Sequence, residues 1–147
     1  MNKADIAGRW NIVEWIQHYD DGRVAYPMGN ALRGFIEYGQ QHVFVVIEKA
    51  HRQPFSSGGQ WSADDAEKAA AYNGYMTYAG EYEVDGEAII HRVHHSIFPD
   101  WEGGVQKREA SLSGDLLTLS GRIEDGTPQA RVVKLIWRRA TGVGSQG

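Results

Sequence analysis

The chain has 147 residues, of which 41% are hydrophobic and 23% charged, and these values fit one ordinary globular domain large enough to enclose a core or a cavity. Its net charge of -4 argues against nucleic acid or an anionic membrane as a partner, because both require clustered cations. The absence of cysteine excludes disulfides, thiolate metal sites and cysteine nucleophiles.

The N-terminal segment shows no targeting signal. The first ten residues, MNKADIAGRW, contain no apolar stretch of the kind found in secretion signals, and no part of the chain approaches the length of a membrane span. We therefore expect a cytoplasmic protein without a membrane partner. We further expect one domain at residues 1–140, followed by a disordered tail at residues 141–147.

Short alternating strands separated by tight turns make up most of the chain. The turns are marked by dipeptides that favour the positive φ angles of hairpins, namely Asp21-Gly22, Asp85-Gly86, Gly114-Asp115 and Asp125-Gly126. The candidate strands lie at residues 8–17, 33–38, 42–49, 77–84, 87–98, 104–113, 116–123 and 129–139. Eight or so antiparallel strands in series predict an all-β fold, either an up-and-down barrel or a sandwich.

Residues 50–62 interrupt this pattern with a loop, and a helical segment, ADDAEKAAAYNGY, follows it. Ser62 with Asp65 three residues later resembles a capping box, and Asn73-Gly74 provides an end signal. A single helix inserted between strands usually covers one end of a barrel. We therefore expect this helix to cover an end.

The turn positions predict which side chains face inward. A two-residue turn at Asp85-Gly86 would pair Tyr82 with Ile89, and one at Gly114-Asp115 would pair Ser113 with Leu116. Both hairpins then divide into one polar and one apolar face. The predicted inner wall of the two hairpins includes Tyr78, Gly80, Tyr82, Ile89, His91, Val93, His95, Ile97, Gln106, Arg108, Ala110, Leu112, Leu117 and Leu119.

The sequence of the first strand allows two facings. Glu14 shares one parity with Trp10, Ile12 and Ile16, which would place its carboxylate inside the barrel. The other parity, with Val13 and Trp15, is also apolar. Both facings are therefore open.

A set of short motifs carries a resemblance to a known family. Gly8-Arg9-Trp10 is similar to the Gly-x-Trp of lipocalin and calycin barrels, in which the Trp stacks on an Arg of the last strand, and Trp137-Arg138-Arg139 offers such an arginine. Further matching segments are Asp21-Gly22-Arg23, Tyr26-Pro27, Arg33-Gly34-Phe35-Ile36, Pro54-Phe55, Ala79-Gly80-Glu81-Tyr82-Glu83-Val84 and Ser96-Ile97-Phe98-Pro99-Asp100-Trp101. Together they resemble the bacterial lipocalin-like domain family, from about residue 7 to residue 140. The resemblance implies a closed barrel with an interior cavity, and it leaves the activity open because the family has no single one.

Metal and cofactor chemistry find little support in the sequence. The run His91-Arg92-Val93-His94-His95 suggests zinc, but on a strand His91 and His95 are about 13 Å apart at ~3.3 Å per residue. That separation is too large for two ligands that each bind at ~2 Å. Neither a Gly-x-Ser-x-Gly elbow nor a phosphate-binding glycine loop is present. We expect no metal and no cofactor.

The ionisable groups of the predicted inner wall favour acid–base chemistry. His91 and His95 are the candidate acid and base, and Arg108 would lower the pKa of a neighbouring histidine and stabilise an anionic oxygen of the substrate. The expected activity is that of a cofactor-independent isomerase, cyclase or lyase acting on a small hydrophobic or aromatic substrate. The candidate substrate-binding residues are Tyr78, Tyr82, Gln106, Glu14, Val93 and Ile97.

Structural interpretations of the same residues stay open beside the catalytic one. His91 can be a core residue bonded to a barrel tyrosine, and Arg108 can form an internal ion pair with Glu14. The whole barrel can equally be a non-catalytic carrier or sensor of a hydrophobic metabolite. The oligomeric state is open, with a homodimer as one option.

Overall fold

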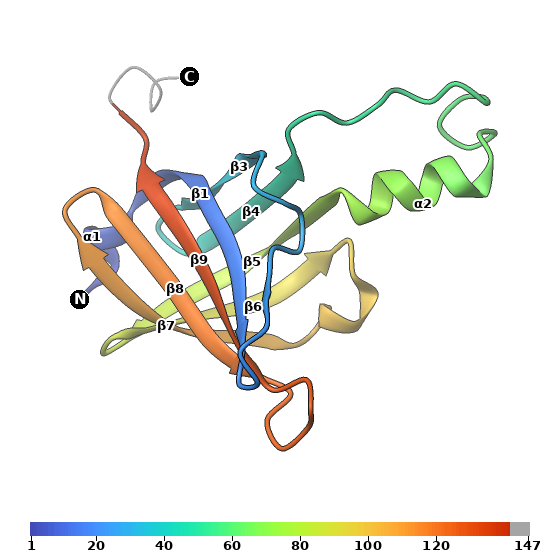
Figure 1. Ribbon diagram of the computed structural model, residues 1–147. Helices are drawn as coiled ribbons and strands as arrows, with labels where there is room; N and C mark the ends of the chain where they lie inside the picture. Colours follow the sequence, from blue (N-terminus) through green and yellow to red (C-terminus); the bar gives the residue numbers. More distant parts are fainter. Residues whose placement is uncertain (142–147) are drawn as a thin grey trace.

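Eight antiparallel strands close into an up-and-down barrel in the computed structural model, which describes residues 1–141 (Figure 1). In chain order the barrel strands are β1 (Gly8–Tyr19), β3 (Leu32–Tyr38), β4 (His42–Lys49), β5 (Tyr75–Asp85), β6 (Ala88–Ser96), β7 (Val105–Ser113), β8 (Leu116–Ile123) and β9 (Arg131–Arg139). Each strand pairs with the next, and β9 pairs with β1 to close the barrel, while the short β2 (Val24–Ala25) pairs only with β1. The predicted all-β barrel is confirmed. Beyond residue 141, the predicted tail lies outside the described residues.

One end of the barrel, which we call the turn end, is formed by the short β3–β4, β5–β6 and β7–β8 turns and by helix α1 (Lys3–Ile6). Trp10 is fully buried there, and its indole Nε1 donates to the Ile6 carbonyl at 2.9 Å. The Arg139 guanidinium lies 4.1 Å from the centre of the Trp10 ring and also donates to the Asp5 carbonyl. The predicted pairing of this tryptophan with an arginine of the last strand is therefore confirmed.

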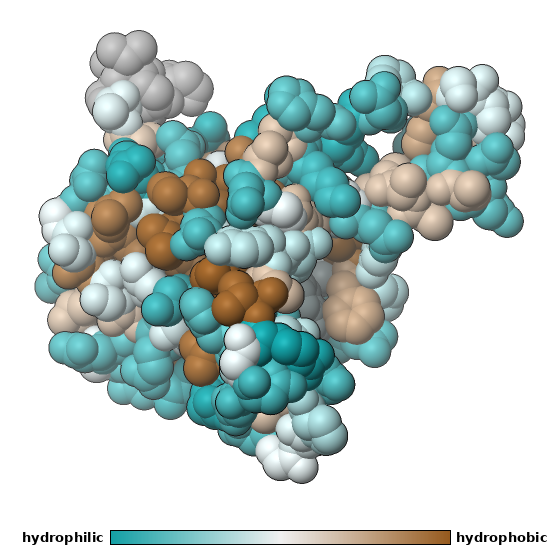
Figure 2. Space-filling model, viewed as in Figure 1, coloured by the Kyte–Doolittle hydropathy of each residue, from teal (hydrophilic) through white to brown (hydrophobic). Residues whose placement is uncertain are grey.

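The opposite end, the loop end, carries the long connections at residues 20–31, 50–74, 97–104 and 124–130. The second of these, which we call the arm, holds the predicted helix as α2 (Asp65–Asn73) and projects away from the barrel (Figure 1). The arm is mostly hydrophilic in Figure 2, none of the residues of α2 is buried, and Trp61 is 80% exposed. The expectation that this helix covers an end is therefore wrong, because its alanine-rich sequence has no apolar face to bury. The helix that covers an end is α1.

The start of α2 also differs from the prediction. Asp64, not Ser62, is the N-cap, and its side chain accepts from the Glu67 backbone N–H at 3.0 Å. The Glu67 carboxylate in turn accepts hydrogen bonds from Ser56 and Ser57, which lowers the Glu67 pKa to about 2. These bonds tie the loop to the helix and order the arm.

The β7–β8 hairpin has the predicted register, whereas the β5–β6 hairpin is displaced. Ser113 pairs with Leu116 as expected. In β5–β6 the turn is Gly86-Glu87, so that Tyr82 pairs with His91 instead of Ile89. A displacement of two residues preserves the period-2 alternation, which explains why the inward set was still correct here: Tyr82, Ile89, His91 and Val93 are all buried.

A β-bulge then reverses the facing of the last part of β6. The register shifts between Ala79 and Gly80, and His95 pairs with Ala79. A Cβ atom on residue 80 would lie 1.8 Å from the Arg92 carbonyl oxygen, so only glycine permits this close approach of the two strands. His95 is exposed as a result. The expected inward position of His95 is wrong.

A second bulge, in β1, settles the facing that the sequence left open. Ile12 pairs with Trp137 and Glu14 with Ile136, which leaves Val13 unpaired and 41% exposed. After the bulge Trp15 faces inward, and Glu14 turns to the outer face. The expected placement of Glu14 in the interior, and with it the internal ion pair to Arg108, is wrong.

Candidate functional site

A cavity of about 280 Å³ occupies the half of the barrel interior nearer the loop end. All eight barrel strands contribute to it, and Trp101 of the 3-10 helix η1 (Pro99–Trp101) adds an aromatic wall. This volume is close to the lower limit of roughly 300 Å³ that is common for small-molecule sites. The lining residues are Trp15, Gln17, Ile36, Val45, Met76, Tyr78, His91, Trp101, Gln106, Arg108, Leu119, Ile123, Val133, Leu135 and Trp137.

His91 is the buried polar residue at the centre of the site. It is 1% exposed on the inner face of β6, and two tyrosines hold its ring. Its Nε2 lies 2.7 Å from the Tyr38 hydroxyl oxygen, and its Nδ1 lies 2.6 Å from the Tyr78 hydroxyl oxygen. Burial, with a contribution from the positive charge of Arg108, lowers the pKa of His91 to about 3. The imidazole is therefore neutral at pH 7.

The two tyrosine hydroxyls stay protonated. Burial raises the pKa of Tyr38, which is 2% exposed, well above the usual tyrosine value. Burial also raises the pKa of Tyr78, against the opposing effect of the Arg108 cation. Tyr38, His91 and Tyr78 thus form a neutral hydrogen-bonded chain, which we call the hydroxyl–imidazole chain. It runs from the turn end toward the cavity.

Arg108 supplies the positive charge of the cavity. Its Nη2 donates to the Gln106 side-chain oxygen at 2.7 Å and its Nη1 to the Lys107 carbonyl at 3.0 Å. None of the ion pairs formed among residues 1–141 includes Arg108. Burial lowers its pKa from the usual value of an arginine, and Gly121 leaves the room that the guanidinium occupies, since a Cβ there would lie 3.3 Å from it.

The family model for lipocalin-like domains matches residues 7–140, which is nearly the whole described chain. The chain belongs to the lipocalin-like domain family. A similar curated protein is the 4'-hydroxy-3'-methoxypropiophenone carrier protein ppsC of Aspergillus oryzae, with 36% identity over 67 residues. That alignment covers 40% of this chain and 60% of the relative, so the chain spans less than two thirds of that protein's length. No solved structure matches the sequence.

The lipocalin-like cavity brings together four of the predicted site residues and leaves out five. His91, Arg108, Tyr78 and Gln106 all line it. His95 and Glu14 face outward because of the two bulges. The remaining three, Tyr82, Val93 and Ile97, lie outside the lining.

Tyr82 has a structural position at the turn end of the barrel. Its hydroxyl donates to the Gly39 carbonyl at 2.6 Å, its ring packs against Tyr38, and the Lys3 ammonium lies 4.5 Å from the ring centre. These contacts hold Tyr38 in place beside His91. Tyr82 therefore supports the hydroxyl–imidazole chain from behind rather than contacting the cavity.

Three tryptophans of the cavity wall were not predicted as site residues. Trp101 meets the Tyr78 ring edge-on, with ring centres 5.9 Å apart. Trp15 and Trp137 also line the cavity. The sequence placed Trp101 and Trp137 only within the family resemblance, and the bulge at Val13 concealed the inward facing of Trp15. Tyr38 was missed too, although it shares strand parity with the buried Ile36.

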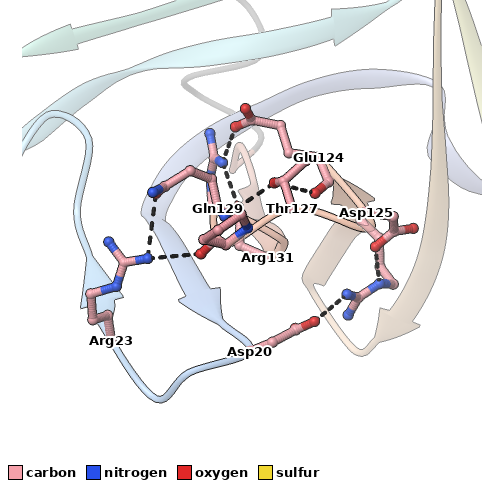
Figure 3. A network of polar contacts seen from close by, with 9 residues as sticks. Asp20, Arg23, Glu124, Asp125, Thr127, Gln129 and Arg131 are labelled. Carbon is pink, nitrogen blue, oxygen red and sulfur yellow. Dashed lines mark hydrogen bonds and ion pairs between the residues drawn. The ribbon is translucent and has the colours of Figure 1, made fainter.

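A network of ion pairs and hydrogen bonds joins the strand ends and connections at the loop end (Figure 3), beside the cavity-lining Gln17 and Ile123. Arg122 donates to both Asp20 and Asp125 at 2.7 Å, which joins β8 to the end of β1. Arg131 bonds to Glu124, and its Nε donates to the side-chain oxygen of Gln17 at 2.7 Å. The β8–β9 connection is thereby fixed beside the cavity wall.

Residues 1–141 contain no group of three or more histidine, aspartate or glutamate side chains that could hold a metal ion. Among the same residues, no helix is long and apolar enough to span a bilayer.

Proposed function

We propose that this lipocalin-like barrel binds and carries a small aromatic molecule inside its cavity. The observation that carries the proposal is the cavity itself, a space of about 280 Å³ lined by all eight strands. Its wall is mostly apolar, and the rings of Tyr78 and Trp101 are arranged edge to face, a geometry suited to enclosing another aromatic ring. The charge of Arg108 provides one orienting contact.

The curated relative supports the aromatic nature of the ligand. Its printed name describes a carrier of 4'-hydroxy-3'-methoxypropiophenone, a substituted aryl ketone. A molecule with one aromatic ring and a few oxygen atoms matches a cavity with aromatic walls and a small polar group of side chains. We therefore propose an aryl ketone or a similar substituted phenol as the class of ligand.

A cavity-filling substitution tests this proposal. Ile123 lines the cavity near the loop end, and Ile123→Trp would occupy part of the space that the ligand needs. Val105→Trp is the matched control, because Val105 is 51% exposed on β7. We expect titration calorimetry with 4'-hydroxy-3'-methoxypropiophenone to show binding to the unsubstituted protein and to Val105→Trp. For Ile123→Trp we expect an affinity at least about tenfold lower, or about 1.4 kcal/mol. Equal affinity of the two variants, or no binding at all, would contradict the proposal.

The same geometry favours a second proposal, a cofactor-free isomerase, cyclase or lyase. His95 lies outside the cavity, and His91, with a pKa of about 3, is too weak a base at neutral pH. The contact between Tyr78 and His91 leaves one acidic group in reach of a substrate, the Tyr78 hydroxyl, with Arg108 placed to stabilise an oxyanion. Turnover that Tyr78→Phe abolishes while binding is retained would support this activity. A pure carrier would show no turnover, and the substitution would change its affinity only.

A further inference from the structure

The polar groups around the cavity are nearly all hydrogen-bond donors. A guanidinium carries five N–H groups, and Arg108 uses two of them within the described protein. The side-chain oxygen of Gln106 already accepts from Arg108, and that of Gln17 already accepts from Arg131. Both amides therefore offer their NH₂ groups rather than an acceptor.

Two further donors belong to tryptophans. The indole Nε1 atoms of Trp15 and Trp137 are buried and have no hydrogen-bond partner among residues 1–141. Both residues line the cavity. A buried donor without a partner costs about 1–3 kcal/mol. A ligand with oxygen atoms that accept hydrogen bonds from these indoles would remove that cost.

The hydroxyl–imidazole chain adds another donor, because its hydrogen bonds can be satisfied in one direction only. Neutral His91 has one N–H and one acceptor nitrogen. If Nε2 carried the proton, it would donate a hydrogen bond to the Tyr38 hydroxyl oxygen. The O–H of Tyr38 would then be left buried without a partner in the described chain. If Nδ1 carries the proton, Tyr38 donates to Nε2 and His91 donates to Tyr78. The O–H of Tyr78, a cavity-lining residue, is then free to donate to a ligand.

From this arrangement we propose that the cavity selects the anionic form of an oxygen-bearing aromatic ligand. The anionic oxygen, a phenolate or a carboxylate, accepts hydrogen bonds from the Arg108 guanidinium and the Tyr78 hydroxyl. This inference rests on the proposed function and adds to it the charge of the ligand. Its physical basis is the Arg108 cation, which is partly buried, forms no ion pair within residues 1–141 and gains a counter-ion when an anion binds.

The experiment uses three nitroaromatic probes of similar size with the full chain. Phenolate formation by 4-nitrophenol is visible by absorbance, so the pKa of the bound phenol can be compared with that of the free phenol. The second probe, 4-nitrobenzoate, asks whether a carboxylate is accepted, and the neutral 4-nitroanisole reports on the cavity alone. We expect the pKa of bound 4-nitrophenol to fall by at least about one unit, a tenfold preference for the anion, or about 1.4 kcal/mol.

Arg108→Gln should abolish this preference, and Tyr78→Phe should weaken it. The matched control is Lys107→Gln, which removes the same charge one residue away at an exposed position of β7. Unchanged affinity of Arg108→Gln for 4-nitroanisole would show that the variant keeps its fold and its cavity. The preference should persist in Lys107→Gln, since only the Lys107 main-chain oxygen contacts Arg108.

Two results would overturn the inference, and they differ from failure of the proposed function. A bound 4-nitrophenol whose pKa equals or exceeds the free value would contradict it, as would a lowered pKa that persists in Arg108→Gln. In both cases binding of 4-nitroanisole would leave the aromatic carrier function standing. If none of the three probes bound, the carrier function itself would be refuted.

Discussion

Lowering the pH should weaken the fold through His91. The pKa of this residue falls from its usual 6.5 to about 3 on folding, because burial disfavours the imidazolium. Above pH 6.5 the folded and unfolded chains both hold a neutral His91, and its contribution to stability is complete. Between pH 6.5 and about 3 the unfolded chain binds the extra proton, so stability is lost as the pH falls through this window.

The size of the effect follows from the width of the window. A pH of 5 lies one and a half units below the pKa of this histidine in the unfolded chain. Each unit is worth about 1.4 kcal/mol, so the free energy of unfolding falls by about 2 kcal/mol. Urea unfolding at pH 7.5 and at pH 5 measures it as a change in the free energy of unfolding. The corresponding change in His91→Gln should be smaller by about 2 kcal/mol, because that variant has no imidazole to protonate.

The comparison between variants isolates His91 from the other groups that titrate in this range. His51→Gln is the matched control, since it removes an exposed histidine of the arm. It should keep the full pH dependence. If the unsubstituted protein lost no more stability between pH 7.5 and pH 5 than His91→Gln does, the neutral buried imidazole would be the wrong description.

Three further substitutions test the fold and the placement of residues. Gly80→Ala should lower the free energy of unfolding by about 2 kcal/mol or more, because its Cβ would lie 1.8 Å from the Arg92 carbonyl oxygen; thermal unfolding that matches the parent protein would argue against the bulge. Arg139→Leu should lower the free energy of unfolding by about 1–2 kcal/mol, because it removes the contact with Trp10 and two hydrogen bonds to carbonyls. Arg138→Leu is the control at an exposed position, and it should lower the free energy of unfolding by less. His95→Ala should leave the affinity for aromatic probes unchanged by titration calorimetry, and a marked loss would place His95 at the ligand after all.

The parts of the fold that depend on turns and alternation could be predicted from the sequence. The Gly114-Asp115 turn has the expected register, and Gly8-Arg9-Trp10 with Arg139 closes the turn end as the resemblance implied. The Asp85-Gly86 dipeptide located its hairpin, but the turn is displaced by one residue, because Gly86 with a φ of 62° is its first residue. Period-2 alternation concealed that error, since a shift of two residues keeps the same face inward.

The parts that could not be predicted depend on bulges and on long-range contacts. The local sequence pattern does not indicate the β-bulge at Val13 or the bulge beside Gly80, where the Arg92 carbonyl lies close to the glycine. These two bulges turn the Glu14 and His95 side chains to the outer face. The partnership of Tyr38 with His91 joins residues 53 positions apart. The sequence suggested a core histidine that is hydrogen-bonded to a barrel tyrosine. Only the closed barrel shows which two tyrosines contact His91, and which ring nitrogen each of them contacts.

A crystal structure of the protein with 4-nitrophenol tests most directly where an aromatic anion binds. We predict the ring inside the barrel, against Tyr78 and Trp101, with its oxygen within hydrogen-bond distance of the Arg108 guanidinium. An empty cavity at saturating ligand, or a ligand bound only on the outer surface, would contradict it.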